Sequence, residues 1–559
     1  MNQDSTQTAT HGTRDLFLLT VLISLFFGFM LGNRPLSVPD EGRYVEIPRE
    51  MVVTGDYLTP RLNGVKYLEK PPLFYWLESL SIQLFGLKEC TLRLWPALFA
   101  LFGCLAVYGA GKRLYGRRSG LIAAAVLATS VLYYALSRDI ILDMPVSILL
   151  TAALLSFLVG THETPGLRRR LFLWGFYVFA ALAVLTKGLI GILIPGMIIG
   201  VWIVILGEWR VLRTIYLPSG ILLFLLIAAP WHILAGRSNP EFLNFYFIHE
   251  HFQRYLTKIH GRYRPAWYFI PVLLVGLFPW TPFLVQAVTF STPSSWRERH
   301  EHRDALFLML WAGLVFLFFS VSDSKLIPYI LPVLPPLAII IGRYLSHALD
   351  GGELPGIKAG TTMLVVISIV IAAGLAITPH YRTDMNERKL HSYFYLLAFV
   401  LGTGALTTYV LHRRKNFKWA FYSLVLSTAL FLLLANSTFP MLDTRSIKSL
   451  AVTLKQRLQP GDEVVSYNTY YQDLPVYLER RITVANWKGE LQFGTTVEDT
   501  SHWMIDDAEF WLRWNGPATV YMLTKRKTFD ELHAAGRENV YLLARTDGNV
   551  LVVNKEMTP

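Results

Sequence analysis

Long apolar segments recur along most of the chain, between Leu16 and Ala435. Each is near the length of about 20 residues that an α-helix needs to cross the hydrocarbon core of a bilayer. Charged residues gather in the stretches between these segments. The pattern predicts a polytopic α-helical membrane protein.

Thirteen segments have this character, which predicts about 13 transmembrane helices. An odd number of helices places the two ends of the chain on opposite sides of the membrane. The predicted spans are 16–32, 92–111, 119–137, 141–160, 171–187, 189–206, 215–235, 266–288, 305–321, 326–348, 361–378, 393–411 and 419–435.

Basic residues between the spans predict the orientation. If the N-terminus is cytoplasmic, the short inside loops contain 18 Lys and Arg residues and the short outside loops contain 6. Cytoplasmic loops carry the excess of basic residues in membrane proteins, so we predict a cytoplasmic N-terminus. Three long segments then lie outside: 33–91, 236–265 and the tail from Pro440.

The first outer loop contains two stretches with apolar residues at helical spacing, 41–53 and 71–86. This spacing predicts amphipathic helices that lie in the plane of the membrane interface.

The tail has the pattern of a small soluble domain. Residues 461–487 predict short strands, residues 527–536 predict a helix that stops at Gly536, and Asp547-Gly548 predicts the turn of a hairpin. We therefore expect a membrane domain, 1–437, followed by an α/β domain, 438–559.

Composition supports a membrane protein and excludes several other classes. Hydrophobic residues make up 53% of the chain and charged residues 16%, whereas soluble domains carry about 25% charged residues. The net charge of +12 arises in the membrane loops, so it does not indicate nucleic-acid binding. Neither a Walker A motif nor G-x-G-x-x-G is present, so we expect no nucleotide cofactor.

Two acidic and basic motifs lie in the first outer loop. Asp40 and Glu41 form a carboxylate pair that can bind a cation or act as a base, or can simply begin a helix. Tyr67, Glu69 and Lys70 precede a double proline that holds them at a turn. The Lys can neutralise a phosphate, or it can form a local ion pair in a solvated loop.

Asp139 and Asp143 follow the third span. Four residues apart, they share a face if the segment is helical. Ionisable residues at such a membrane boundary are candidates for function. The alternative is that Arg138 pairs with Asp139 while Asp143 begins the next helix.

Two later outer segments carry further candidates. His249 can bind a metal and Arg254 can clamp a phosphate, although both also suit an interfacial helix with a hydrogen-bonded histidine. Lys325 and Tyr329 are four residues apart and can converge on an anion. Their alternative is a lysine that extends to the interface and a tyrosine of the aromatic belt.

All these motifs share the outer side of the membrane in the predicted topology. Because nucleotide-activated substrates are not supplied there, an activated group must arrive on a carrier. A lipid phosphate carrier fits both a site at membrane depth and the cationic residues near it.

The motifs PDEGRYVEI, YLEKPP and RDIILDM resemble the bacterial aminoarabinose transferases, which are membrane glycosyltransferases of the GT-C fold related to the protein O-mannosyltransferases. The resemblance implies a GT-C membrane domain with a periplasmic C-terminal domain, in the bacterial inner membrane. It implies 4-amino-4-deoxy-L-arabinose on undecaprenyl phosphate as the donor and a phosphate of lipid A as the acceptor. The modified lipid A would resist polymyxin and other cationic peptides.

The resemblance also implies roles for residues. Asp40 and Asp143 become the key acidic residues of a direct displacement with inversion. The remaining substrate-binding candidates are Arg43, Tyr67, Glu69, Lys70, Asp139, Arg254, Lys325 and Tyr329. Glu69 and His249 become candidate ligands of a divalent metal, Zn or Mg.

Three alternative functions stay open from sequence. One is a related GT-C transferase that moves hexosamine or mannose to lipid or protein. Another is a lipid-linked substrate transporter or flippase, although no inverted repeat is visible. The third is a receptor or assembly factor, which leaves the outer charged motifs without a joint purpose. We further expect a monomer in the phospholipid bilayer.

Overall fold

The computed structural model describes residues 2–246, 263–349, 354, 356–381, 388–442, 446–537 and 539–556. The chain divides into two compact units. The bundle unit comprises Met1–Leu31, Leu94–Pro230 and Ile248–Thr438. The loop–tail unit comprises Gly32–Arg93, Trp231–Phe247 and Phe439–Pro559.

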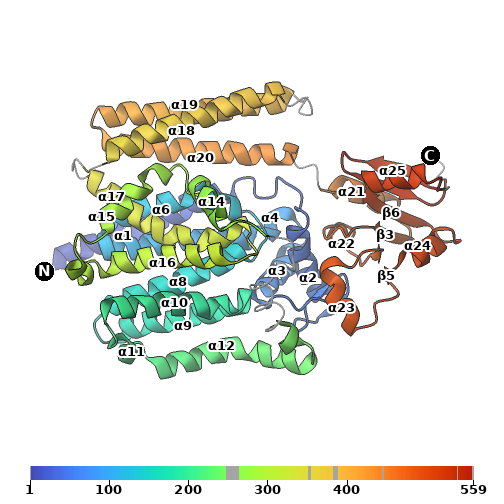
Figure 1. Ribbon diagram of the computed structural model, residues 1–559, viewed down its shortest axis with the longest axis horizontal. Helices are drawn as coiled ribbons and strands as arrows, with labels where there is room; N and C mark the ends of the chain where they lie inside the picture. The colour runs from blue at the N-terminus through green and yellow to red at the C-terminus, as the bar shows by residue number, and fades with distance from the viewer. Residues whose placement is uncertain are drawn as a thin grey trace. The chain divides into compact units, whose positions relative to one another are not determined.

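The bundle unit consists of helices, and its long helices run alongside one another in Figure 1. Its α-helices are α1 Asn2–Gly28, α5 Leu94–Tyr115, α6 Arg117–Ala128, α7 Val131–Leu136, α8 Asp143–His162, α9 Leu167–Lys187, α10 Ile190–Leu206, α11 Val211–Thr214, α12 Leu217–Ser238, α14 Phe269–Gly276, α15 Leu284–Ser291, α16 Arg303–Val321, α17 Leu334–Leu349, α18 Ile357–Tyr381, α19 Arg388–Arg413 and α20 Phe417–Leu442. The last residues of α12, from Trp231, and of α20, from Phe439, belong to the loop–tail unit. Short 3-10 helices include η2 Ala266–Tyr268, η3 Thr281–Phe283, η4 Trp296–His300 and η5 Ile327–Val333.

Among the described residues, nine helices are long and apolar enough to cross a membrane, or up to ten if one bent pair is a single span. The multi-pass character is therefore confirmed, and the count of thirteen stays a prediction. The expected span 119–137 is broken between α6 and α7. The expected span 266–288 bends by 106° between Ala266–Gly276 and Thr281–Ser291.

Hydrogen bonds join the two broken segments. The backbone N–H of Val131 donates to the oxygen of Phe278 at 3.2 Å, and Trp280 Nε1 donates to Thr129 Oγ1 at 3.0 Å. Backbone polar groups that leave a helix at membrane depth must find partners inside the protein. Each break therefore satisfies groups that the other one frees, which no pattern within a single segment reveals.

The centre of the bundle unit is formed by α8 and by Ile327–Leu349, whose apolar windows are each 89% buried. Small residues allow close packing beside them. A Cβ added to Gly342 of α17 would lie 2.8 Å from the side chain of Ala123 in α6. Small residues at helix contacts are typical of membrane bundles.

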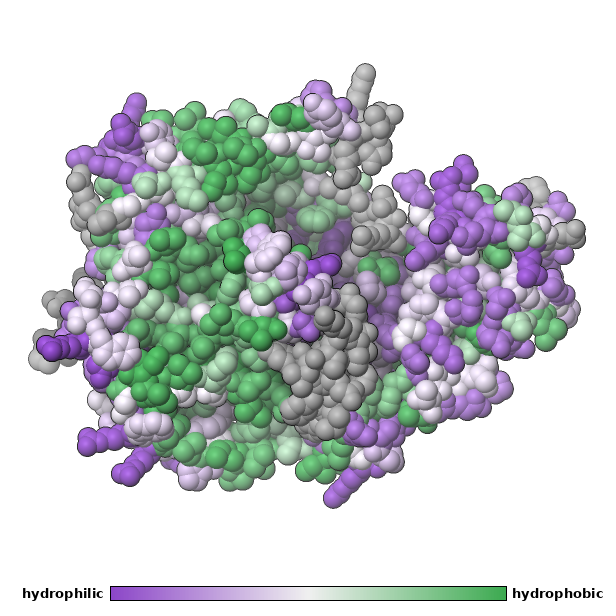
Figure 2. Space-filling model, viewed as in Figure 1, coloured by the Kyte–Doolittle hydropathy of each residue, from purple (hydrophilic) through white to green (hydrophobic). Residues whose placement is uncertain are grey.

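Helices α18, α19 and α20 lie side by side as a layer of their own (Figure 1). Their apolar windows are only 22–28% buried, so this layer exposes most of its surface to lipid. Hydrophobic side chains form a broad cover over the bundle unit on the face shown in Figure 2.

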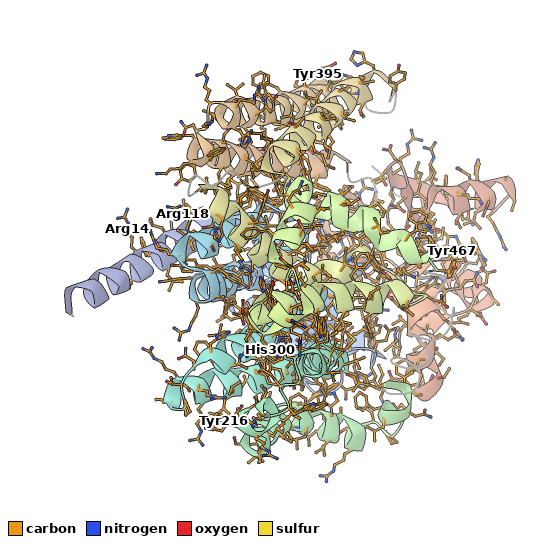
Figure 3. All side chains as sticks on the ribbon, turned by 60° about the vertical axis from the view of Figure 1, so that its left-hand side comes forward. Arg14, Arg118, Tyr216, His300, Tyr395 and Tyr467 are labelled. Atoms are coloured by element: carbon orange, nitrogen blue, oxygen red, sulfur yellow. The ribbon has the colours of Figure 1, made fainter. Side chains whose placement is uncertain are left out.

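Basic residues mark one end of the bundle unit. Arg14 and Arg118 lie near each other at that end in Figure 3. There Arg117 binds Asp15 through two hydrogen bonds of 2.6 Å, which ties α1 to α6. This is the end that the distribution of basic residues predicts to be cytoplasmic.

The tail folds around a six-stranded sheet with the order β5-β4-β3-β6-β8-β7. Its strands are β3 Glu463–Tyr467, β4 Thr483–Ala485, β5 Met504–Ile505, β6 Val520–Lys525, β7 Tyr541–Arg545 and β8 Asn549–Val553. Strands β3, β4, β5 and β6 run parallel, while β8 is antiparallel to β6 and β7. The helices of the tail are α21 Lys448–Arg457, α22 Leu474–Leu478, α23 Gln492–Val497, α24 Asp507–Trp514 and α25 Arg526–Ala534.

The predictions for the tail are largely confirmed. The hairpin at Asp547-Gly548 joins β7 to β8, and α25 ends just before Gly536, which has φ +66°. Helix α22 was not predicted between the two strands of 461–487. Aromatic residues of α24, including Phe510 and Trp514, form the core against the sheet.

The first outer loop packs on the tail within the loop–tail unit. It contains α2 Asp40–Thr54, the short hairpin β1 Arg61–Leu62 and β2 Val65–Lys66, α3 Leu73–Phe85 and α4 Glu89–Leu92. Asn63 and Ile482 exchange two hydrogen bonds, from Asn63 Nδ2 to the Ile482 oxygen at 2.9 Å and from the Ile482 N–H to Asn63 Oδ1 at 3.0 Å. Trp503 Nε1 donates to the Asn63 oxygen at 2.9 Å.

This packing changes two expectations. Every residue of α2 from Glu41 to Met51 is buried, so α2 does not present one exposed apolar face as an interfacial helix would. The unit that contains the tail also takes in Gly32–Arg93 and Trp231–Phe247, so it is larger than the predicted domain 438–559. The reason is tertiary: the loop satisfies its polar groups on the tail, a pairing that no local pattern encodes.

Candidate functional site

Arg43 is the centre of a charged cluster at the start of α2. Its Nη1 lies 3.3 Å from Asp40 Oδ1, and its Nη2 binds Glu490 of the tail. Gln472 Nε2 donates to the other oxygen of Glu490 at 2.9 Å. Arg43 is buried while the Asp40 side chain is 50% exposed, so Asp40 is the accessible acid of the cluster.

Gly42 allows this cluster to form. A Cβ at Gly42 would lie 2.5 Å from the backbone nitrogen of Asp473 and 2.7 Å from the carbonyl carbon of Gln472. Any larger residue would push α2 away from that backbone. The glycine between Glu41 and Arg43 therefore brings the first outer loop close enough to the tail for Arg43 to reach Glu490.

Asp40 and Glu41 have different roles. Neither side chain caps α2, whose N-cap residue is Pro39 with no side-chain cap hydrogen bond. Glu41 is fully buried and binds Arg93 at 2.7 and 2.9 Å and the backbone N–H of Ser37 at 2.8 Å. Burial by itself would raise the pKa of Glu41, but the charges of Arg93 and Arg34 lower it to about 2. Glu41 is a structural anion, and the predicted reactive pair reduces to Asp40.

Tyr67, Glu69 and Lys70 lie at the predicted turn before α3. Lys70 Nζ donates to the Glu69 carbonyl oxygen at 2.9 Å. Tyr67 is 2% exposed, and burial raises its pKa well above the usual value, opposed by the charge of Arg43 and assisted by that of Glu69. The phenol therefore stays protonated and can donate a hydrogen bond.

Two aromatic residues extend this surface. Tyr44 stacks on Tyr75 with ring centroids 6.1 Å apart, and Arg43 lies 5.8 Å from the Tyr44 ring centroid. The buried hydroxyl of Tyr75 has no hydrogen-bond partner among the described residues. The charges of Glu69, Arg43 and Glu490 act on this hydroxyl, which places it near the same cluster.

A second cluster lies in the bundle unit. Lys187 Nζ lies 2.6 Å from Asp143 Oδ1 and 4.8 Å from the centroid of the Tyr329 ring. Asp143 is the first residue of α8 and Lys187 the last of α9, so each charge lies at the helix end whose dipole stabilises it. The three side chains come from distant segments and form a compact group of one acid, one cation and one phenol.

Asp139 does not share a helical face with Asp143, as the spacing suggested. It lies in the turn between α7 and α8. Arg138 donates at 2.8 Å to the Phe27 oxygen and also binds the Phe29 oxygen, so its guanidinium closes the end of α1. Because of the turn at 137–142, Asp139 and Asp143 do not lie on one helix.

The ammonium of Lys325 is held by backbone carbonyl oxygens. Its ammonium donates to the Arg264 carbonyl oxygen at 2.9 Å and to the Ser322 carbonyl, and the residue is 4% exposed. Lys325 and Tyr329 therefore do not converge on a common anion as predicted. Lys187 takes the place beside Tyr329.

The predicted metal ligands are only partly described. His249 and Arg254 lie outside the described residues. Within the described part of the chain, no group of three or more His, Cys, Asp or Glu side chains could hold a metal ion. Only Glu69 of the predicted pair is available, so the described residues do not by themselves make a metal site.

Sequence reasoning missed Lys187, Glu490 and Tyr75. Lys187 ends an apolar span, and an ionisable residue at that boundary is a signal that could have identified it. Glu490 carries no such signal, because it lies in a polar tail and meets Arg43 only through folding. Tyr75 looked like one more aromatic residue of an amphipathic helix.

Two family models match separate parts of the chain. Residues 69–234 match the model described as dolichyl-phosphate-mannose-protein mannosyltransferase. Residues 450–555 match the model of the aminoarabinose transferase C-terminal domain. The second match covers the six-stranded sheet of the tail.

Relatives and solved structures match nearly the whole chain. Undecaprenyl phosphate-alpha-4-amino-4-deoxy-L-arabinose arabinosyl transferase from Edwardsiella ictaluri is 29% identical over 534 residues, which is 91% of this chain and 94% of that protein. The corresponding transferase 1 of Proteus mirabilis is 32% identical over 423 residues, 74% of each chain. The crystal structure of ArnT from Cupriavidus metallidurans bound to undecaprenyl phosphate has a TM-score of 0.85 and 29% identity, covering 96% of this chain and 98% of that chain.

The helical bundle with its sheet-containing tail is thus the architecture of a GT-C membrane glycosyltransferase, and the fold predicted from sequence is confirmed. Within that class, the chain belongs to the family of undecaprenyl phosphate-α-4-amino-4-deoxy-L-arabinose arabinosyl transferases.

Proposed function

We propose that this protein transfers 4-amino-4-deoxy-L-arabinose from undecaprenyl phosphate to a phosphate of lipid A. The observation that carries the proposal is the match along 96% of the chain to ArnT from Cupriavidus metallidurans, a structure described as bound to undecaprenyl phosphate. The lipid A acceptor and the resulting resistance to polymyxin come from the family resemblance of the sequence motifs.

The leaving group sets the first chemical requirement. When the bond between the anomeric carbon and the phosphate oxygen breaks, the electron pair stays on the polyprenyl phosphate. Preorganised donors stabilise this developing charge most effectively. Lys70 and Arg43 in the loop–tail unit, and Lys187 and Tyr329 in the bundle unit, are of the type this step requires.

The acceptor sets the second requirement. A lipid A phosphate is already an anion near neutral pH, so its oxygen can attack the anomeric carbon without loss of a proton. The new carbon–oxygen bond forms as the old one breaks, and the configuration inverts. No general base is needed for this acceptor, whereas a hydroxyl acceptor would need one.

The two acids then have different roles. The donor sugar carries a cationic amino group, and a carboxylate such as Asp40 can position it. Asp143 is bound to Lys187 at 2.6 Å, so we assign it to orienting that cation. Asp40 lies 3.3 Å from Arg43 and likewise orients the Arg43 guanidinium before substrate binds.

We propose that the loop–tail unit and the reaction lie on the periplasmic side of the inner membrane, with a cytoplasmic N-terminus. The support is the excess of basic residues in the predicted inside loops, and the supply of the sugar on a lipid carrier. We also propose a monomer. Cysteines substituted at Arg118 and Lys527, both exposed, test the orientation by their labelling with a membrane-impermeant reagent in intact cells.

A divalent metal held by Glu69 and His249 remains a proposal, and no step of the reaction above passes through it. Metal analysis of the purified protein and of a Glu69→Gln, His249→Ala variant tests it. A stoichiometric Zn or Mg that the variant loses supports the site, and equal metal content in both proteins contradicts it.

Mass spectrometry of lipid A tests the proposed reaction. The host is a Gram-negative strain that lacks its own aminoarabinose transferase and still makes the lipid-linked sugar. We expect lipid A heavier by one aminopentose with the unmutated protein, and unmodified lipid A with the Asp40→Asn variant or an empty vector. Asp40 is half-exposed, so its substitution is not expected to prevent folding.

The family-model match to dolichyl-phosphate-mannose-protein mannosyltransferase makes another sugar the second candidate. Unmodified lipid A with folded protein in the membrane, together with transfer from a mannosyl or hexosaminyl polyprenyl phosphate in vitro, would assign that function instead.

A further inference from the structure

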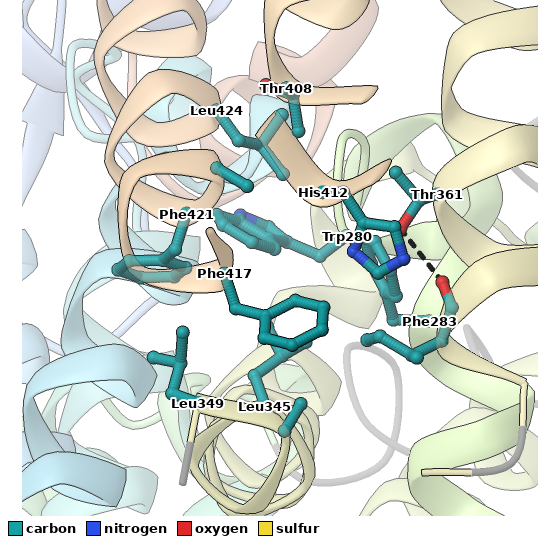
Figure 4. Close-up of a pocket in the computed structure, with 13 residues that line it drawn as sticks. Trp280, Phe283, Leu345, Leu349, Thr361, Thr408, His412, Phe417, Phe421 and Leu424 are labelled. Carbon is teal, nitrogen blue, oxygen red and sulfur yellow. Dashed lines mark hydrogen bonds between the residues drawn. The ribbon is translucent and has the colours of Figure 1, made fainter. Parts of the chain in front are cut away.

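An open pocket lies in the bundle unit where α5 and α8 end and α16 begins. Its volume is about 470 Å³, within the range of about 300–1,000 Å³ that ligand pockets occupy. Its lining residues are Gly109, Lys112, Arg113, Leu114, His162 and Asp304. By contrast, the hollow between α17 and the helices α18–α20 has a volume of only about 50 Å³ and a mostly apolar lining (Figure 4). The pocket at the ends of α5 and α8 therefore has both room for a ligand and charges that can select one.

A glycine keeps one wall of this pocket open. Gly109 lies on α5 three residues before Lys112 and is exposed. A Cβ added to Gly109 would meet no neighbouring segment or side chain within 4 Å. Glycine inside a helix is less stable than alanine, and the packing around Gly109 gives no reason to prefer it. The missing side chain leaves space in the pocket.

Lys112 contributes a positive charge that no acid neutralises. Its ammonium forms no hydrogen bond or ion pair with a described residue, and it lies 5.8 Å from the centroid of the Tyr108 ring. The charge of Lys112 acts on Asp15. That carboxylate is already bound by Arg117 through two hydrogen bonds of 2.6 Å. Helix α1 bounds the ammonium on one side, since a Cβ at Gly12 would lie 2.7 Å from Lys112 Nζ.

The other charged side chains of the lining are paired. Arg113 binds Glu163, and His162 Nε2 lies 2.7 Å from Asp304 Oδ1. The Arg113 side chain is 44% exposed, and a guanidinium has five N–H donors, so Arg113 can donate to a ligand while it binds Glu163. These pairs leave the charge of Lys112 in excess. The pocket is therefore suited to an anion.

The pocket lies at an end of the membrane-spanning helices. Three of the helices that are long and apolar enough to cross a membrane end or begin there: Glu89–Tyr115, Asp143–His162 and Arg303–Val321. Arg14 and Arg118 mark the same end of the bundle unit (Figure 3), which the proposed orientation places in the cytoplasm. The cytoplasmic leaflet contains anionic phospholipids, and basic pockets between membrane helices bind their headgroups.

We propose that this pocket binds an anionic glycerophosphate headgroup, with its phosphate on Lys112 and Arg113. A lysine ammonium attracts phosphate as a compact charge, and an arginine adds directed N–H donors. The glycerol hydroxyls lie beside His162 and Asp304, which can accept and donate hydrogen bonds. The depth of the pocket favours an anionic phospholipid such as phosphatidylglycerol as the source, and soluble glycerol phosphate shares the same chemistry.

This site is separate from the proposed sugar transfer. Asp143 and His162 are the first and last residues of α8, a helix of 20 residues. Such a helix is about 30 Å long. The pocket therefore lies at the opposite end of α8 from the pair formed by Asp143 and Lys187. Loss of lipid binding and loss of sugar transfer are separate outcomes.

Native mass spectrometry of the full-length protein tests the proposal. The delipidated protein is titrated with phosphatidylglycerol and with phosphatidylcholine that carries the same acyl chains. Each basic residue near an anionic lipid changes affinity about fivefold. We therefore expect the first phosphatidylglycerol to bind at least fivefold more tightly than phosphatidylcholine.

Variants of Lys112 test the charge. Lys112→Gln should lower the affinity for phosphatidylglycerol about fivefold and leave that for phosphatidylcholine unchanged. Lys112→Arg keeps the charge and should keep the preference. Arg213→Gln removes an exposed cation from another predicted inside loop and should leave both affinities unchanged.

A matched pair of glycine variants tests the space. Gly109→Leu places a side chain in the pocket and should abolish the preference for phosphatidylglycerol. Gly196 of α10 is also exposed, and a Cβ there would also meet nothing within 4 Å, but it does not line the pocket. Gly196→Leu should therefore leave binding unchanged. Leucine favours a helix over glycine, so both variants should fold.

Competition with soluble glycerol 3-phosphate separates the two sources. Retention of phosphatidylglycerol at an equal concentration of glycerol 3-phosphate supports the lipid. Displacement at that concentration would overturn the lipid assignment and give the pocket to a soluble phosphate ester. Equal affinity of the unmutated protein and Lys112→Gln for phosphatidylglycerol would overturn the proposal and leave Lys112 as a solvated lysine. An unchanged preference in Gly109→Leu would overturn it as well.

Discussion

The charged cluster around α2 and the one formed by α8 and α9 balance their charges in different ways. On α2 the charges form networks: Arg43 has two acidic partners, and Glu41 has two arginines. Between α8 and α9 there is one acid and one cation, Asp143 and Lys187, with Tyr329 beside them.

The difference follows from the surroundings. In the loop–tail unit the first outer loop provides Arg34 and Arg93 for Glu41, and the tail provides Glu490 as a second partner for Arg43. The bundle unit offers α8 and α9 few polar neighbours, and each charge depends on one partner and on a helix end. Substitutions on α2 should therefore affect stability and activity at different residues. A substitution in the α8–α9 pair should change the net charge of the whole group.

The largest effect is expected at Glu41. Removal of one partner from a buried ion pair costs about 3–5 kcal/mol, and Glu41 is fully buried between Arg93 and Arg34. Glu41→Gln should lower the free energy of unfolding by that amount in a denaturant titration of the purified protein. Asp40→Asn is the adjacent control and should leave stability unchanged. Equal stability of both variants would contradict the structural role of Glu41.

The next effect concerns Lys187. If it stabilises the leaving phosphate, Lys187→Met should lower the transfer rate about 10²–10³-fold, as loss of one preorganised donor does. Lys325→Met is the control, because that ammonium binds two backbone carbonyls. Its expected defect is a lower melting temperature with a normal rate per folded molecule. A large loss of rate in Lys325→Met with no loss in Lys187→Met would reverse the assignment of the two lysines.

A smaller effect is expected at Glu490. Its carboxylate binds Arg43 and would compete with a donor phosphate for that guanidinium. A hydrogen bond to a charged group contributes about 1.5–3 kcal/mol, so Glu490→Gln should lower KM for the donor by about tenfold with little change in kcat. Steady-state kinetics with purified donor measure this. A raised KM would instead show that Glu490 positions Arg43 for binding.

A pH dependence of stability is expected from Glu46, which is fully buried on α2. Burial raises its pKa to about 8 although Arg49 binds it through bonds of 2.6 and 2.7 Å. The folded protein thus keeps a proton that the unfolded chain loses above about pH 4.5, so stability falls as pH rises from there toward 8. The slope is at most about 1.4 kcal/mol per pH unit.

Melting temperatures between pH 6 and pH 8 check this effect. We expect a fall in the unmutated protein that is absent in Glu46→Gln. Glu479→Gln, at an acid whose side chain is 58% exposed, is the control and should behave like the unmutated protein. Parallel pH profiles of all three proteins would show that Glu46 does not carry the dependence.

The local patterns of the chain predicted much of the fold. Apolar segments gave the membrane helices, and the turn at Asp547-Gly548 gave the hairpin of the tail, because both depend on residues close in sequence. Asp40, Lys70 and Asp143 were predicted from their motifs, and Asp143 also from its position directly before an apolar segment. These signals can be read from the sequence without knowledge of the fold.

The failures have a common cause. The breaks at Thr129 and Phe278 are stable because they bind each other, and a pattern within either segment shows only apolar residues. Lys325 looked accessible from its sequence neighbours, but Arg264 lies 61 residues away and takes up its ammonium. Such partners are fixed by distance in space, which spacing along the chain does not encode.

Sequence alone therefore determined the class of this protein: a multi-pass helical bundle with an α/β tail. Tertiary structure decided which charge has which role. Asp40 and Glu41 are neighbours with the same functional group, yet folding exposes one and buries the other between two arginines. The physical reason is that the reactivity of a carboxylate depends on its exposure and its partners, and both are supplied by segments remote in the sequence.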